Sequence, residues 1–171
     1  MPRFDPDRIL RELHHEGVRF IVIGGIGAAA LGSPSLTDDL DICYERSREN
    51  LERLSRVLMR LGAKLRGAPA DLPFTPDAPT LAAGDHFTFT TDAGDFDCMG
   101  TPSGSKGYAD LAERAVLTDM DGIEVLVASV DDLILMKQAA GRPKDLIEVE
   151  VLGALKDELD RRKEGPRQPG G

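Results

Sequence analysis

The segment from Asp39 to Tyr44 constrains the fold more than any other part of the sequence. It reads Asp-Leu-Asp-Ile-Cys-Tyr, so acidic and apolar side chains alternate at its start. Side chains two apart in a β-strand point to the same face, and Asp39 and Asp41 therefore share one face while Leu40 and Ile42 share the other. The pattern predicts a strand that packs one face on a core and turns two carboxylates toward a polar site.

The paired carboxylates need a cation. Two adjacent anions repel each other, and this repulsion raises the pKa of both unless a positive charge lies between them. Mg²⁺ supplies such a charge, and proteins typically hold it with few carboxylates together with the phosphates of a substrate. Asp95-Phe96-Asp97 repeats the pattern later in the chain. Because Asp-x-Asp is also common at exposed strand edges, the interpretation needs support from elsewhere.

Gly24 and Gly25 provide that support. They follow the apolar run Val18–Ile23, which is typical of a buried strand, and precede a short Ala-rich helix over Ile26–Leu31. Backbone N–H groups at the start of a helix bind anions, and glycine lets a phosphate approach closely. A phosphate cradle followed by a pair of metal-binding carboxylates indicates a nucleoside-triphosphate site.

The same glycines allow a second interpretation. Gly25-Ile26-Gly27-Ala28-Ala29-Ala30 fits the G-x-G-x-x-A motif of dinucleotide-binding folds. That motif requires a full crossover helix and a strand with its acid at the carboxyl end. Here Ser33-Pro34 ends the helix early, and the acids stand at the start of the next strand. We therefore favour the triphosphate interpretation.

A second group of charged residues lies near the carboxyl terminus. Lys137 falls on the apolar side of a predicted helix over Val130–Ala140, where a lysine either extends along the surface or points into a site. Arg142 and Lys144 flank the start of the next helix, a position that favours anions. Asp145, in the first turn of that helix, is expected to face inward.

Composition limits the class of protein. The 171 residues, 41% of them hydrophobic, suffice for one domain with a real core. No apolar stretch approaches the roughly 20 residues of a membrane span, and the start of the chain lacks the apolar region of a signal peptide. Cys43 and Cys98 are too few for a disulfide framework, and we expect them to stay reduced on opposite sides of a sheet. These features predict a cytoplasmic protein without membrane contact.

The charge balance bears on the partners. Thirty Asp and Glu face 21 Lys and Arg, which gives a net charge of -9. Such a surface does not attract nucleic acid over its whole area, so a nucleic-acid substrate would require a local basic patch.

The order of the predicted elements indicates an α+β fold, with a mixed β-sheet flanked by helices. We expect one domain over residues 1–164 and a disordered tail over 165–171, and the Pro-rich segment Gly67–Gly84 is predicted as a surface loop. A two-residue turn near Ala93-Gly94 should join two strands as a hairpin. The predicted helices are Asp5–Glu16, Ile26–Leu31, Ser47–Leu61, Tyr108–Arg114, Val130–Ala140 and Pro143–Lys163, and the predicted strands are Val18–Ile23, Asp39–Tyr44, His86–Thr91, Asp95–Met99, Val116–Met120 and Ile123–Ala128.

Taken together, these motifs resemble the nucleotidyltransferase superfamily with its DNA-polymerase-β-type palm. The resemblance rests on Gly24-Gly25, on Thr37-Asp38-Asp39-Leu40-Asp41-Ile42 and on Gly94-Asp95-Phe96-Asp97. Within the superfamily the chain is most similar to the minimal bacterial branch of AbiEii-type and MenT-like toxins. Leu133–Lys137 resembles the helix lysine motif of that branch, and Arg142–Leu146 resembles its R-x-K-D motif.

The resemblance implies transfer of a nucleoside monophosphate from an NTP to a hydroxyl, with Mg²⁺ or Mn²⁺ and release of pyrophosphate. Asp39, Asp41 and Asp97 would hold the metal, and Asp97 would also activate the acceptor hydroxyl. Asp145 would orient the phosphate-binding groups or act in catalysis. The nucleotide would be bound by Gly24, Gly25, Thr37, Lys137, Arg142 and Lys144.

Two carboxylates compete for the third metal position. Asp95 directly follows Gly94 at the predicted turn, where an exposed carboxylate commonly serves the turn itself. Asp97 lies one step further into an apolar strand, which holds a side chain more rigidly. We therefore prefer Asp97.

The acceptor, whether tRNA, protein or a small molecule, stays open at this point, as do the base of the NTP and the oligomeric state. The resemblance suggests a toxin–antitoxin or defence setting with a cognate antitoxin protein as partner. The alternative is a catalytically inactive palm-like module that binds a nucleotide or a partner protein. The retained acids and Lys137 favour the enzyme.

Overall fold

A sheet of seven strands forms the centre of the protein in this computed structural model, which describes residues 3–34 and 36–165. The strands are β1 (Phe20–Ile23), β2 (Asp39–Tyr44), β3 (Lys64–Leu65), β4 (His86–Thr91), β5 (Gly94–Met99), β6 (Val116–Met120) and β7 (Ile123–Val127). The helices are α1 (Pro6–Glu16), α2 (Gly24–Ala30), α3 (Arg48–Arg60), α4 (Ala78–Ala83), α5 (Tyr108–Arg114), α6 (Val130–Ala140) and α7 (Pro143–Glu164). Residues 166–171 lie outside the described part, so the division into a domain over 1–164 and a tail over 165–171 stays a prediction.

The sheet is mixed, in the order β3-β4-β5-β2-β1-β7-β6. β2 runs parallel to β5 and β1 runs parallel to β7, whereas the other neighbouring pairs are antiparallel. This arrangement confirms the predicted α+β fold with a mixed sheet flanked by helices. It contradicts the dinucleotide-binding interpretation, because β2 returns antiparallel to β1 after the short helix α2 instead of adding a parallel strand through a crossover.

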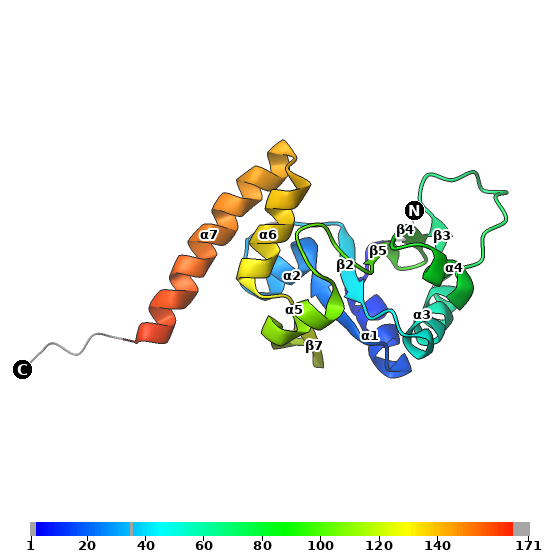
Figure 1. Cartoon of the computed structure of the whole chain (residues 1–171), viewed down its shortest axis with the longest axis horizontal. Coiled ribbons are helices and arrows are strands. Elements are labelled where there is room, and N and C mark those ends of the chain that lie inside the picture. The colour runs from blue at the N-terminus through cyan, green and yellow to red at the C-terminus, as the bar shows by residue number, and fades with distance from the viewer. Residues whose placement is uncertain (1–2, 35, 166–171) are drawn as a thin grey trace, which may run out of the picture.

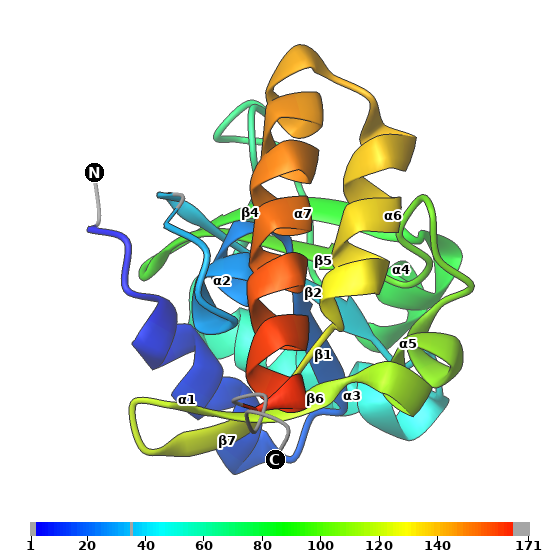
Figure 2. The same cartoon turned by 90° about the vertical axis from the view of Figure 1, so that its left-hand side faces the viewer.

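The two faces of the sheet pack on different helices. Leu40, Ile42 and Tyr44 belong to a core that includes side chains of α1 and α3, as their alternation along β2 predicts. Cys43 lies on the opposite face, in a smaller core with side chains of α5, α6 and α7. Figure 2 shows α6 and α7 in front of the sheet, and Figure 1 shows them on the side away from α1, α3 and α4. Cys98 belongs to the first core, so the two cysteines lie on opposite faces, as expected.

Some local predictions were wrong. The predicted loop Gly67–Gly84 contains helix α4, because Asp77 caps its start by accepting a hydrogen bond from the Thr80 N–H at 3.0 Å and Leu81 of the helix is buried in the core. Strand β3 was missed, since two residues carry no periodic signal. Helix α2 begins at Gly24 rather than at Ile26.

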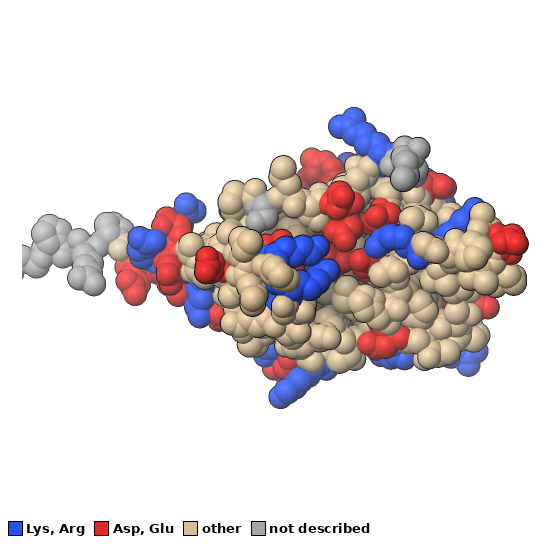
Figure 3. Space-filling view, turned by 90° about the horizontal axis from the view of Figure 1, so that it is seen from above, with Lys and Arg blue, Asp and Glu red and all other residues tan. Residues whose placement is uncertain are grey.

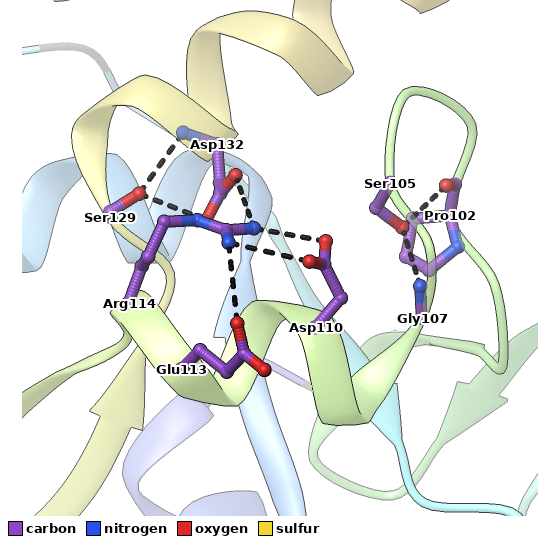
Figure 4. Close-up of polar contacts among 8 residues, drawn as sticks. All are labelled: Pro102, Ser105, Gly107, Asp110, Glu113, Arg114, Ser129 and Asp132. Carbon is purple, nitrogen blue, oxygen red and sulfur yellow. Dashed lines mark hydrogen bonds and ion pairs between the residues drawn. The ribbon is translucent and has the colours of Figure 1, made fainter.

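The hairpin of α6 and α7 is fixed to the rest of the fold through Arg114 of α5 (Figure 4). The Arg114 guanidinium donates to both oxygens of Asp132 on α6, at 2.9 and 3.1 Å, and to both oxygens of Asp110 on its own helix. Asp132 in turn accepts from the hydroxyl of Ser129, the residue that caps α6. These charge-assisted hydrogen bonds connect α5 to the start of α6, and Asp132 is buried where it receives them. No helix within the described residues has both the length and the apolar character that crossing a membrane requires.

Candidate functional site

A cavity of about 810 Å³ lies between the sheet and the α6–α7 hairpin, and the residues singled out in the sequence converge on it. Figure 3 shows acidic side chains gathered near the middle of one face of the molecule, with basic side chains on two sides of them. The predicted residues that line the cavity are Gly24, Gly25, Thr37, Asp39, Asp41, Asp97, Lys137, Arg142, Lys144 and Asp145. All ten therefore lie around one space, although they come from five separate parts of the chain.

Three carboxylates meet where β2 and β5 run side by side. The parallel register pairs Asp41 with Asp97 and Asp39 with Asp95. One oxygen each from Asp39, Asp41 and Asp97 lies within 4.8 Å of the others. Hard oxygen donors at this spacing suit Mg²⁺ or Mn²⁺, so the donor set fits the metal that the resemblance implies.

The environment of Asp41 also calls for a cation. Burial, followed by the negative charges of Asp39 and Asp97, raises the pKa of Asp41 to about 8. The positive charge of Lys137 opposes this rise without cancelling it. In the absence of a metal, Asp41 therefore keeps its proton through neutral pH, and a bound cation would release it.

The glycine pair makes room for the site's own side chains. Gly24 has a φ of 65°, and a Cβ at this position would collide with the Asp41 carboxylate. A Cβ on Gly25 would lie 2.7 Å from the Cβ of Thr37. The Thr37 hydroxyl donates a hydrogen bond to Oδ1 of Asp39 at 2.9 Å and so orients that carboxylate. The glycines thus set the positions of two acids, a reason that the sequence alone did not reveal.

Sequence reasoning missed Arg66, which follows strand β3 and also lines the cavity. Its Nη2 donates to Oδ1 of Asp97 at 2.6 Å and to the Phe89 carbonyl at 2.8 Å. Its Nε lies 3.4 Å from Oδ2 of Asp95. Arg66 reaches the acids because β3 pairs with β4 at the sheet edge, and no local pattern around residue 66 signals that pairing.

The structure corrects the interpretation of Asp95. The hairpin turn is Asp92-Ala93, and Thr91 serves it by accepting from the Ala93 N–H at 3.0 Å and donating to the Gly94 carbonyl at 2.7 Å. Asp95 lies within the strand and pairs with Arg66 instead. Its side chain is 42% exposed and that of Asp97 is 11% exposed, which agrees with the expectation that Asp97 lies deeper.

The opposite wall carries basic side chains that are already paired with acids. Lys137 Nζ lies 2.7 Å from Oε2 of Glu148 and 3.6 Å from Oδ1 of Asp145. Arg142 donates from both Nε and its backbone N–H to Oδ2 of Asp145, so this fully buried carboxylate caps helix α7. The hydrogen bond from the Arg142 side chain lowers the pKa of Asp145 despite its burial. Glu148 was also missed, although its position three residues after Asp145 puts it on the same side of the helix.

A third stretch of the wall is less charged. It comes from β4 and from the loop after β5, and it includes His86, Thr88, Thr101 and Ser103. Asp85 anchors this loop, because its Oδ2 accepts from the Thr101 N–H at 3.0 Å. Hydroxyl and imidazole groups thus face a part of the cavity beyond the carboxylates and the basic wall.

Comparisons with known proteins agree on the fold. No protein-family model matches the sequence, and a search of curated proteins found no match. Among solved structures, the lincosamide antibiotic adenylyltransferase LnuA with lincomycin bound matches with a TM-score of 0.58 and 13% identity, over 88% of this chain and 95% of that chain. The antibiotic-resistance factor ANT(2″)-Ia, solved in solution, matches with a TM-score of 0.53 and 16% identity, over 93% and 91%. The chain therefore has the fold of nucleotidyltransferases, as the resemblance of its motifs implied.

Proposed function

We propose that this protein is a metal-dependent nucleotidyltransferase that moves a nucleoside monophosphate from an NTP to a hydroxyl group. One observation carries the proposal. The three carboxylates of Asp39, Asp41 and Asp97 converge within 4.8 Å on one wall of a cavity whose opposite wall bears Lys137 and Arg142. The three carboxylates would hold a divalent cation, whose charge would offset theirs, and Lys137 and Arg142 would contact the negative phosphates of the NTP.

Asp39, Asp41 and Asp97 would hold the Mg²⁺ or Mn²⁺, which stabilises charge on the attacking and leaving oxygens when bound. Asp97 takes the proton of the acceptor hydroxyl. The acceptor oxygen then bonds to the α-phosphorus, and the bond from that phosphorus to the pyrophosphate oxygen breaks. Thr37 keeps Asp39 in its orientation through the 2.9 Å hydrogen bond.

The basic wall and the glycines bind the nucleotide in this proposal. Lys137, Arg142 and Lys144 contact the phosphates, and the backbone of Gly24-Gly25 lies against them. Lys137 exchanges its carboxylate partner, Glu148, for a phosphate oxygen. Asp145 is a positioning residue, since it is buried between Arg142 and Lys137 and holds both at the cavity.

We propose a small hydroxylated molecule as the acceptor. Among the residues that line the cavity, acidic side chains outnumber basic ones, and the chain carries a net charge of -9. A polyanion such as tRNA would be repelled by this surface. The lincomycin bound to LnuA is consistent with a small acceptor. A toxin–antitoxin setting, an antitoxin partner and a cytoplasmic location stay predictions from the sequence.

Labelled NTPs test the proposal. The protein is incubated with each α-³²P-labelled NTP and Mg²⁺ or Mn²⁺, together with hydroxylated small molecules such as lincosamides and aminoglycosides, or with total tRNA. We expect label in the small-molecule fraction and none with Asp41→Asn. NTP binding without transfer to any acceptor would favour the inactive nucleotide-binding module, and label on RNA would contradict the small acceptor.

A further inference from the structure

The cation nearest to the acidic centre is Arg66, which belongs to none of the predicted motifs. We propose that Arg66 is an internal counter-ion that pairs with Asp97 in the metal-free protein and moves to Asp95 when the carboxylates hold a divalent cation. This inference rests on the metal centre of the proposed function. It also explains why β5 carries two acids, Asp95 and Asp97, on one face, although the proposed function uses only Asp97.

The metal-free position follows from the contacts of Asp97. Arg66 is its only ion-pair partner among the described residues, at 2.6 Å from Nη2 to Oδ1. This oxygen belongs to the carboxylate that converges with Asp39 and Asp41. Asp39 and Asp41 have no ion-pair partner in the described part of the chain. The Arg66 guanidinium is therefore the positively charged group that forms an ion pair with this cluster.

The second position is half prepared. Arg66 Nε is buried, donates no hydrogen bond to a described residue, and lies 3.4 Å from Oδ2 of Asp95. A buried donor without a partner costs free energy, so a small rotation toward Asp95 gains a hydrogen bond. The bond from Nη2 to the Phe89 carbonyl, at 2.8 Å, keeps the guanidinium near both acids during that rotation.

Electrostatics drives the exchange. A divalent cation among Asp39, Asp41 and Asp97 adds two positive charges beside the guanidinium, and like charges repel strongly in a partly buried site. Asp95 lies outside the cluster and is the more exposed of the two acids on β5. Asp95 then forms the ion pair with the Arg66 guanidinium, and the Asp97 oxygens become free to bind the metal.

A double-mutant cycle on Mn²⁺ affinity tests the exchange. Mn²⁺ binding to the full chain is measured by electron paramagnetic resonance, without NTP, for wild type, Arg66→Gln, Asp95→Asn and the double variant. We expect Arg66→Gln to bind Mn²⁺ about tenfold more tightly, because the competitor is gone, and Asp95→Asn to bind about threefold more weakly. In the Arg66→Gln background, Asp95→Asn should change the Mn²⁺ affinity little, since this variant has no guanidinium that could move from Asp97 to Asp95. Arg48→Gln removes an equal charge at an exposed position and should leave the affinity unchanged.

Two results would overturn the inference. Equal weakening by Asp95→Asn in both backgrounds would mean that Asp95 acts through its charge alone. Weaker Mn²⁺ binding by Arg66→Gln would mean that Arg66 supports Asp97 permanently. If Arg66→Gln does not fold, Arg66→Met takes its place in the cycle, because it also removes the positive charge and keeps most of the length of the side chain. Loss of the metal centre itself is a separate outcome, recognised when Asp41→Asn binds Mn²⁺ as well as wild type does.

Discussion

The two walls of the cavity neutralise their charges in different ways. On the sheet wall, Asp39 and Asp41 have no ion-pair partner among the described residues, and Asp97 has Arg66. On the hairpin wall, Lys137 is paired with Glu148, and Arg142 is paired with Asp145. The sheet wall is therefore short of positive charge, whereas on the hairpin wall carboxylates hold Lys137 and Arg142 in place.

The two walls are assembled by different means. On the sheet wall, the register between β2 and β5 brings the acids together, because it fixes which residues lie opposite each other and on which face their side chains point. The basic side chains are long and flexible, and they stay at the cavity because buried or nearby acids position them. An incoming cation meets Asp39 and Asp41 without ion-pair partners among the described residues, whereas a phosphate that binds Lys137 must displace Glu148.

Loss of one carboxylate from the sheet wall should have the largest effect. We expect Asp41→Asn and Asp39→Asn each to lower nucleotidyl transfer by about a thousandfold or more, since the metal loses a ligand. The fold should persist, and Asp41→Asn should raise the melting temperature of the metal-free protein, because the buried asparagine is neutral and the folded state no longer has to hold a proton on a carboxylate there. Transfer assays and circular-dichroism melting check both. Full transfer activity in either variant would contradict the proposed metal site, because the carboxylates of the sheet wall would then not be needed to bind a cation.

The two acids of β5 should differ strongly. We expect Asp97→Asn to lower transfer by about a hundredfold at saturating NTP and Mg²⁺, and Asp95→Asn to lower it by less than about fivefold. Asp97 is within the cluster, and Asp95 contacts it through Arg66 alone. The reverse ranking would assign the third metal position to Asp95.

Removal of a cation from the hairpin wall should have a smaller effect. Lys137→Ala should raise the KM for NTP and lower kcat, each by about tenfold, because its phosphate contact must first replace Glu148. Lys156→Ala is the matched control, since Lys156 pairs with Asp131 at 2.6 Å and does not line the cavity. Equal effects of the two substitutions on KM and kcat would mean that Lys137 does not contact the NTP and only packs along the surface of α6.

The titration of Asp41 should appear as a modest pH dependence. Its pKa in the folded protein is about 8, against 3.8 for the unconstrained group, so the folded state binds the proton more tightly. The metal-free protein should therefore lose up to about 1.4 kcal/mol of stability per pH unit between roughly pH 4 and 8, relative to Asp41→Asn. Mg²⁺ affinity should rise over the same range, because binding expels the proton. Melting curves with and without Mg²⁺ test this, and identical pH profiles for wild type and variant would contradict it.

The smallest expected effect concerns the cysteines, which lie on opposite faces of the sheet and cannot approach each other. Burial, assisted by Asp85, raises the pKa of the Cys43 thiol to about 12, and burial raises that of Cys98. We expect no reaction with a thiol reagent in the folded protein and two free thiols after denaturation without reductant. Detection of no thiol would contradict this arrangement of the two strands.

Several features of the site were readable in the sequence because they depend on local periodicity. The alternation from Asp39 to Tyr44 predicted which side chains face the core, and the glycine pair before it marked a turn into a short helix. The deeper position of Asp97 relative to Asp95 followed from its distance to the turn. These inferences need one strand at a time, and a strand's two faces are set by its own backbone.

Other features were decided by tertiary structure alone. Arg66 meets Asp97 because a two-residue strand pairs across the sheet edge, and Glu148 meets Lys137 because two helices fold back on each other. The hairpin turn was predicted near Ala93-Gly94 and is Asp92-Ala93, because the register between β4 and β5 places Thr91 opposite Gly94. Asp95 therefore lies within the strand and not at the turn. The sequence alone thus determined which residues face a polar site. The tertiary structure decided which charges neutralise one another there, because ion pairs depend on distances between segments that no local pattern encodes.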